Sequence, residues 1–278
     1  MSTTTQRSTF VTSHRLVQAF VLGALMLPAA RAFPSDVLQS TGWNRHASRL
    51  DKRIDRVNGW PLAGAWQNPV IEHMIQVCTG TAPTLNCAER DLYEFGVYTG
   101  RYMRMLVVEL ARRGVPYRKF FGFDSFQGLP EEANTTRTRL SKNVWKPGAF
   151  NAADIFQVHS ATELELKLKR FINDSRVEFV RGFYNESLTP QLAEERSMRP
   201  ALYVEIDCDL YISSVQALDW MLANKLIVKG TVLGYDDLIT GGEGGERRAH
   251  AEMVAKYGLK LRKLRQYIFV VEAVGLPG

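Results

Sequence analysis

From residue 91 onward, short apolar runs alternate with segments whose apolar residues recur at helical spacing. The runs lie at 92–95, 120–123, 177–180, 202–206, 231–235 and 268–271. Between the first two, Met103, Leu106, Val107 and Leu110 mark one helix face, and Gly114 follows two arginines as a helix stop. This alternation is typical of βαβ units. We therefore predict an α/β fold with a mostly parallel sheet.

Two further helices are predicted from their N-terminal caps. Residues 163–169 alternate like a strand, but Ser160 and Glu163 form a capping box. The apolar positions there also share one helix face: Leu164, Leu168 and Phe171. We therefore predict a helix. After the fourth strand, Ser213 or Ser214 is expected to cap a helix whose apolar face is Val215, Leu218 and Leu222.

The N-terminal third divides into two segments before the core. Residues 1–32 contain no Asp or Glu, carry an apolar run at 16–27, and end in Ala-Arg-Ala. This is the layout of a cleavable targeting leader, for export or for an organelle such as a plastid. The alternative is a cytoplasmic protein whose extension is not a signal. We predict a leader at 1–32, a helical cap at 33–90 and the main domain at 91–278. The apolar run is short for a membrane span, so none is expected in the mature protein.

Charge and cysteine content exclude several classes of protein. The formal net charge is +6, but half of it comes from arginines in the leader, and no basic stripe with interleaved aromatics follows. Nucleic acid is therefore not an expected partner. Cys78, Cys87 and Cys208 are few and show no C-x-x-C spacing. We therefore expect buried thiols, with neither a disulfide framework nor a thiolate zinc site.

Carboxylates follow the predicted strands at the points where the strands end. They are Glu94, Asp124, Asp207, Asp236 and Asp237. Ligands of open α/β sheets bind outside the carboxyl ends of the strands. Acids that converge there repel one another unless a cation or a hydroxyl-rich ligand compensates them. We therefore expect the functional site at this edge.

The first strand leads into a glycine turn and a helix. The segment from Glu94 through Gly96 and Tyr98 to Gly100 has the spacing E-x-G-x-x-x-G. Glycines there allow a close backbone approach, and a helix N-terminus offers N–H groups to an anion. A dinucleotide would prefer G-x-G-x-x-G, so it fits less well. Asp124, at the end of the second strand, is a candidate to bind ribose hydroxyls.

A second acidic group follows the fourth and fifth strands. Asp207 precedes Asp236 and Asp237 by one strand–helix–strand unit, so adjacent parallel strands bring these acids together. Carboxylate oxygens suit a hard divalent cation such as Mg²⁺. Such a cation would lower the pKa of a substrate hydroxyl, and Asp209 is then the natural general base. The histidines His73, His159 and His250 are expected to be structural.

Five segments together resemble the macrocin O-methyltransferase family. They are YEFGVYTG (93–100), FGFDSFQGLPE (121–131), RGFYNESLTP (181–190), EIDCDLYISS (205–214) and YDDLITGGEGGERRA (235–249). The chain departs from the family pattern at Arg101 and Tyr102, where small residues are usual, and at Leu238, where an aromatic residue is expected.

The resemblance implies a class I methyltransferase fold, with a seven-stranded, mostly parallel sheet that ends in an antiparallel hairpin. It implies S-adenosylmethionine and Mg²⁺ as cofactors, and a sugar hydroxyl as acceptor. The cofactor set is then Glu94, Gly96, Tyr98, Thr99, Gly100, Asp124 and Ser125. The implied metal ligands are Asp207, Asp236 and Asp237, and the implied base is Asp209.

Two other functions remain open from the residues alone. A nicotinamide-dependent sugar oxidoreductase would use the same sheet edge, and a non-catalytic cofactor-binding protein would keep the fold without the reaction. The polar, turn-rich segment 131–157 is expected to be a lid or a binding loop. A homo-oligomer is compatible with the sequence, which does not specify one.

Overall fold

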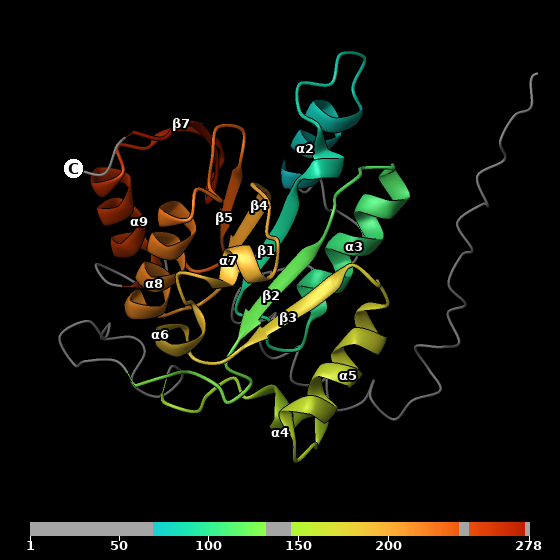
Figure 1. Ribbon diagram of the computed structural model, residues 1–278, viewed down its shortest axis with the longest axis vertical. Coiled ribbons are helices and arrows are strands. Elements are labelled where there is room, and N and C mark those ends of the chain that lie inside the picture. Colours follow the sequence, from blue (N-terminus) through green and yellow to red (C-terminus); the bar gives the residue numbers. More distant parts are fainter. Residues whose placement is uncertain (1–68, 132–145, 239–244, 276–278) are drawn as a thin grey trace, which may run out of the picture.

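The computed structural model describes residues 69–131, 146–238 and 245–275. A seven-stranded sheet runs through its centre, in the order β3-β2-β1-β4-β5-β7-β6 (Figure 1). The strands are β1 Asp91–Phe95, β2 Phe120–Asp124, β3 Val177–Arg181, β4 Ala201–Ile206, β5 Val232–Tyr235, β6 Lys260–Arg265 and β7 Ile268–Ala273. The first five are mutually parallel, and β7 runs antiparallel to both β5 and β6.

Helices cover both faces of the sheet (Figure 1). One face carries α2 Pro69–Thr79, α3 Arg101–Arg113, α4 Ala152–Phe156 and α5 Ala161–Ile172. The other carries α7 Leu192–Glu195, α8 Tyr211–Ala223 and α9 Gly245–Lys256, with the short α6 Tyr184–Ser187 beside α8. This three-layer arrangement buries both faces of the central strands, as parallel sheets require.

The alternation of side chains along β1 explains the two cores. All five residues of β1 are buried. Leu92 packs into the core under α3 and α5, whereas Tyr93 and Phe95 pack into the core under α8. Phe95 stacks on Phe123 of β2 with ring centroids 4.4 Å apart. Such a strand must be apolar on both faces, which is why the sequence shows continuous apolar runs instead of alternation.

The six strands predicted from apolar runs are confirmed, and so is the antiparallel final hairpin that the family resemblance implied. The pattern missed β6, because its sequence KLRKLR is mostly basic and exposed. β6 is one of the two edge strands of the sheet. Exposed lysines and arginines on an edge strand oppose pairing with another chain, so polarity here is consistent with a strand.

The predicted helices are confirmed, with one correction at a cap. Ser160 caps α5 by accepting the Glu163 N–H at 3.1 Å, and Gly114 ends α3 in the left-handed region. The prediction that Ser213 or Ser214 caps α8 is wrong, because both lie inside that helix and Leu210 holds the N-cap position. The Ser214 hydroxyl instead donates to the Leu210 carbonyl within the helix, at 2.8 Å.

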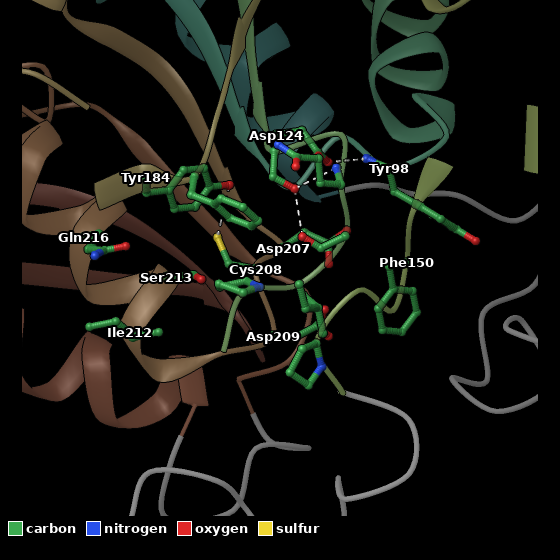
Figure 2. A pocket seen from close by; sticks show the side chains of 18 of the residues that line it. Tyr98, Asp124, Phe150, Tyr184, Asp207, Cys208, Asp209, Ile212, Ser213 and Gln216 are labelled. Carbon is green, nitrogen blue, oxygen red and sulfur yellow. Dashed lines mark hydrogen bonds between the residues drawn. The ribbon is translucent and has the colours of Figure 1, made fainter. Parts of the chain in front are cut away.

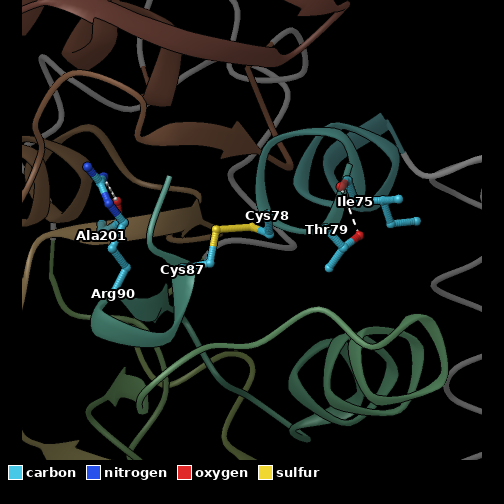
Figure 3. Close-up of a disulfide and its surroundings, with 6 residues drawn as sticks. All are labelled: Ile75, Cys78, Thr79, Cys87, Arg90 and Ala201. Atoms are coloured by element: carbon cyan, nitrogen blue, oxygen red, sulfur yellow. Dashed lines mark hydrogen bonds between the residues drawn. A yellow bond between two sulfur atoms is a disulfide. The ribbon is translucent and has the colours of Figure 1, made fainter. Parts of the chain in front are cut away.

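The prediction that the cysteines are free thiols is wrong for two of them. Cys78 in α2 and Cys87 in the 3₁₀ helix η2 (Cys87–Glu89) form a disulfide (Figure 3). Nearby, Arg90 donates to the Ala201 carbonyl at 3.0 Å. The bridge therefore fastens α2 to the segment that leads into β1. Cys208 is a buried free thiol, as expected.

Several sequence predictions fall outside the described residues. They concern the leader at 1–32, the part of the cap before residue 69, and residues 132–145 of the 131–157 loop. The described end of that loop differs from the prediction, because it contains the short helix α4. Of the cap, α2 is described, and its buried Val70, Ile71 and Met74 join the core beneath α3. Within the described part of the chain, no helix is long and apolar enough to cross a membrane.

Candidate active site

A cavity of about 1220 Å³ opens at the carboxyl edge of the parallel strands, as predicted. It is lined by the residues that follow β1, β2, β3, β4 and β5, and by the first turns of α8. In Figure 2, Tyr98 and Phe150 lie on one side of the view, Ile212 and Gln216 lie on the other, and Asp124, Asp207 and Asp209 lie between them. Single drug-sized ligands occupy cavities of roughly 300–1,000 Å³. The volume here exceeds that range.

The glycine turn after β1 is held against the loop after β4. Gly96 has a φ of +96°, and a Cβ there would lie 1.8 Å from the Asp207 carbonyl oxygen. Only glycine fits this approach. The Gly100 Cβ position instead faces Leu168 and Ile172 of α5, so this glycine serves helix packing. Tyr98 also has a left-handed backbone, with a φ of 46°.

Asp124 holds this turn through its carboxylate. Its Oδ2 accepts the backbone N–H groups of Val97 (2.9 Å) and Tyr98 (2.8 Å), and its Oδ1 accepts that of Phe126 (2.6 Å). Burial raises the pKa of Asp124, and these three hydrogen bonds oppose the rise. A carboxylate has about four acceptor directions, so one remains for a ligand. Asp124 therefore both shapes the turn and faces the cavity.

The predicted cofactor residues divide into two groups. Gly96, Tyr98, Asp124 and Ser125 line the cavity. The Ser125 hydroxyl donates to the Gly128 carbonyl and accepts the Gln127 N–H, which fixes the loop after β2. The remaining three lie outside the cavity lining: Glu94, Thr99 and Gly100. Their contact with a cofactor stays a prediction.

Glu94 lies inside the sheet core and is only 1% exposed. It stands opposite Glu205 of β4, and burial together with the Glu205 charge raises the pKa of its carboxyl well above the usual range. Its Oε2 has no hydrogen-bond partner among the described residues. Two buried carboxylates side by side cannot both ionise without large cost. This pair therefore favours a protonated state.

The second acidic group meets in the same cavity. Asp207, Asp209, Asp236 and Asp237 all line it, although they come from two separate loops. Burial and the Asp236 charge raise the pKa of Asp207 well above its usual range. Burial and the Asp237 charge raise the pKa of Asp236 to about 6. The predicted convergence at adjacent strands is thus confirmed, and its electrostatic cost is large.

The donor set suits a hard divalent cation in its chemistry. Carboxylate oxygens are the ligands that Mg²⁺ prefers, and a cation would relieve the repulsion among these acids. Among the described residues, however, no group of three or more His, Cys, Asp or Glu side chains is placed as a set of metal ligands. The acids therefore fit Mg²⁺ by chemical type, whereas their side chains are not arranged as a ligand set in this structure.

Asp209, the predicted base, adopts a left-handed backbone conformation with a φ of 60°. Few residues other than glycine do so, and such positions cluster at functional sites. It lies at the turn between β4 and α8 and faces the cavity beside Asp207 (Figure 2). The Asp209 side chain therefore lines the cavity next to Asp207.

Sequence reasoning missed a buried acid behind the cavity. Glu246, in the first turn of α9, is fully buried and binds the backbone of both acidic loops. Burial and the charges of Asp237, Asp209 and Asp236 raise its pKa well above the usual range. Its position after four glycines within residues 241–245 was a signal for a tightly packed helix start.

Other lining residues were also missed, and one histidine prediction holds. Tyr184 and Ile212 line the cavity within segments of the family resemblance, and Phe150 lies in the predicted binding loop, but none was assigned to the site. Gln216 lines the cavity outside every such segment. His250 is structural, because its ring contacts the Tyr235 hydroxyl and the Phe269 ring.

The strand order, the glycine turn and the acids at the sheet edge define a Rossmann-like class I methyltransferase fold. The profile of the macrocin O-methyltransferase (TylF) family matches residues 72–259, which is more than half of the chain. The chain belongs to this family and is an O-methyltransferase. This membership leaves the oxidoreductase alternative without support.

Solved structures share the fold. The calicheamicin methyltransferase CalS11 is 19% identical with a TM-score of 0.55, over 82% of this chain and 91% of that one. The O-methyltransferase NovP is 19% identical with a TM-score of 0.54, over 83% of this chain and 96% of that one. No curated protein sequence matches the chain.

Proposed function

We propose that this protein transfers a methyl group from S-adenosylmethionine to a hydroxyl of a sugar or glycosylated natural product, with the aid of Mg²⁺. The observation that carries the proposal is the meeting of the glycine turn with Asp207, Asp209, Asp236 and Asp237 in one cavity. Membership in a family of O-methyltransferases supports it. A cavity of about 1220 Å³ accommodates a cofactor and an acceptor together.

Different residues of the cavity would bind the cofactor and the cation. The turn at Gly96 and Tyr98, the remaining acceptor direction of Asp124, and the loop at Ser125 would hold the cofactor. Asp207, Asp236 and Asp237 would hold the cation. S-adenosylmethionine supplies an electrophilic methyl group on a sulfonium, and bound Mg²⁺ supplies the charge that makes a nearby hydroxyl more acidic.

In the reaction, Asp209 would accept the proton of the acceptor hydroxyl. Bound S-adenosylmethionine would supply the methyl carbon for the new O–C bond, and the electrons of the broken S–C bond would stay with the sulfur of S-adenosylhomocysteine. The protein's main contribution would be to hold both reactants in line. Asp209 is suited to this role because its left-handed backbone fixes its carboxylate beside Asp207.

The choice of acceptor is expected to depend on the cavity wall opposite the glycine turn. This wall contains Ile212 and Gln216, one turn apart on α8, and Asn185 of α6 also lines the cavity. An apolar surface with two amide side chains suits a hydroxylated ring, because the ring packs on the former and its hydroxyls bond to the latter. A sugar acceptor therefore fits this wall.

The cation requirement is tested by titrating Mg²⁺ into the purified protein by calorimetry. Wild type is expected to bind Mg²⁺, whereas the double variant Asp236→Asn/Asp237→Asn loses the binding, because amide oxygens carry no charge. The matched control is Glu186→Gln, an exposed acid at the cavity mouth. Equal Mg²⁺ binding by the double variant would contradict the assignment of these two acids.

We also propose that the protein folds in an oxidising compartment. Disulfides persist there and are rare in reducing cytosol. The Cys78–Cys87 bridge and the acid-free start of the chain both favour a secretory or organellar route. Alkylation of the denatured protein, purified from its native cells, should modify one of the three cysteines before reduction and all three afterwards. Three modified cysteines before reduction would contradict the proposal.

A further inference from the structure

Glu246 contacts both loops that carry the acids of the candidate site. Its Oε1 accepts the Cys208 N–H at 3.2 Å, and its Oε2 accepts the Asp237 N–H at 3.0 Å. Cys208 lies between Asp207 and Asp209, and Asp237 is itself one of the acids. One carboxylate therefore joins the loop after β4 to the loop after β5, through backbone groups of both.

The neighbouring Gly245 reinforces this contact. It has a φ of +59°, and a Cβ at this position would lie 3.1 Å from the Asp209 carbonyl oxygen. A side chain would thus press on the turn that carries the predicted base, while the left-handed backbone itself favours glycine. Gly245 and Glu246 together dock the start of α9 against both acidic loops.

The rest of α9 is bound to α8, and this holds Gly245 and Glu246 in place against the acidic loops. Tyr211 donates to Glu252 at 2.6 Å, and Arg248 donates to the other oxygen of Glu252 at 2.8 Å. One turn further on, Lys256 bonds Asp219 at 2.6 Å. The N-terminus of α9 therefore cannot shift without disturbing α8, whose own N-terminus follows Asp209 directly.

A buried carboxylate in this position has a large cost unless its charge is compensated. The two backbone N–H groups and the positive end of the α9 dipole supply part of that compensation. A structural acid could be replaced by an apolar residue if packing were its only purpose. The two hydrogen bonds reach specifically to the loops that hold Asp207, Asp209 and Asp237, and this makes the role one of positioning.

We infer that Glu246 is a positioning residue that fixes the spacing between the two acidic loops, and thereby sets the affinity of the site for its divalent cation. The inference rests on the proposed function. It assigns Glu246 no contact with the cation or the acceptor. Residues that orient metal ligands typically change metal affinity by about 10- to 100-fold when they are removed.

Calorimetric titration with MgCl₂ of the full chain tests this inference. We expect Glu246→Ala to weaken Mg²⁺ binding at least about tenfold, while S-adenosylmethionine affinity stays within about twofold. Glu246→Gln keeps one acceptor oxygen and should lose less than Glu246→Ala. The matched control is Glu272→Gln, which changes a half-exposed acid of β7 and should leave Mg²⁺ affinity unchanged.

The outcomes separate this inference from the proposed function. If wild type binds Mg²⁺ and both Glu246 variants bind it equally well, the positioning role is wrong. If folded wild type binds no Mg²⁺, the metal part of the proposed function fails instead. Should both variants fail to fold, hydrogen exchange of wild type decides: slow exchange of the Cys208 and Asp237 amides is expected, and fast exchange of either would overturn the inference.

Discussion

At the scale of single residues, the candidate site is held together by acidic side chains that bind backbone groups. Asp124 was predicted as a ribose-binding acid, and the structure shows it accepting three backbone N–H groups first. Glu246 does the same for the acidic loops. Carboxylates are efficient here because each oxygen accepts two bonds and the charge strengthens them. The geometry of the loops therefore depends on a few buried acids.

Replacement of Asp124 by Asn should weaken cofactor binding through the turn. The amide can keep the bonds from Val97 and Tyr98, but its NH₂ group then faces the Phe126 N–H. We expect a loss of about 1–3 kcal/mol in unfolding free energy. We also expect S-adenosylmethionine affinity to fall at least about tenfold, equivalent to about 1.4 kcal/mol.

The matched control is Asp174→Asn, measured by urea unfolding and by calorimetry. Asp174 also accepts several hydrogen bonds, from Tyr117 and Arg176, but it precedes β3 at the opposite edge of the sheet. It should lose comparable stability and keep its cofactor affinity. Equal cofactor affinity in Asp124→Asn and wild type would contradict the role of the turn.

At the scale of elements, the pattern of apolar residues predicted the strands because burial on both faces of a parallel sheet requires it. The same logic explains what it missed. β6 is polar because it is an edge. The Cys78–Cys87 bridge was missed because cysteine spacing carries no information on which segments meet in space. Glu246 was missed because its partners are backbone groups of loops distant in the sequence.

The disulfide should stabilise the attachment of α2 to the core. It joins residues nine apart in sequence, and closing a loop of this size contributes about 2–3 kcal/mol in the chain-entropy model. We therefore expect Cys78→Ser/Cys87→Ser to lower the unfolding free energy by about this amount in thermal or urea unfolding. Addition of a reducing agent should lower the unfolding free energy of wild type and leave that of the double variant unchanged. A reductant-insensitive wild type would contradict the bridge.

His250 of α9 packs against Phe269 of the final hairpin, and its burial predicts that the free energy of unfolding falls in acid. Burial lowers the pKa of His250 to about 4, below its ordinary value of 6.5. As pH falls from about 6.5 to about 4, the unfolded chain takes up a proton that the folded chain does not, so stability declines across this window. Between pH 7 and pH 5 the loss is about 2 kcal/mol at most.

Urea unfolding of wild type and His250→Gln at pH 7 and pH 5 measures this effect. Glutamine can keep the hydrogen bond to the Tyr235 hydroxyl but does not titrate. The variant should therefore lose less stability on acidification than wild type does. An identical loss in both proteins would show that His250 is not the source of the acid sensitivity.

At the scale of the whole molecule, the fold brings together acids that the sequence separates by more than a hundred residues. Asp124 follows β2, Asp207 follows β4, and Asp236 follows β5. Parallel strands place all three at one edge, and this is why the general location of the site was predictable from strand ends alone. The residues of the cavity walls were not predictable in this way. Phe150, Ile212 and Gln216 belong to loops and helix starts whose packing depends on tertiary structure.

The central claim is that this cavity binds S-adenosylmethionine for methyl transfer. It is tested most directly by calorimetric titration of the purified full-length protein with S-adenosylmethionine in the presence of Mg²⁺, with NAD⁺ as the competing ligand. We predict one saturable site for S-adenosylmethionine and none for NAD⁺. A folded protein that binds NAD⁺, or that binds neither ligand, would contradict the account.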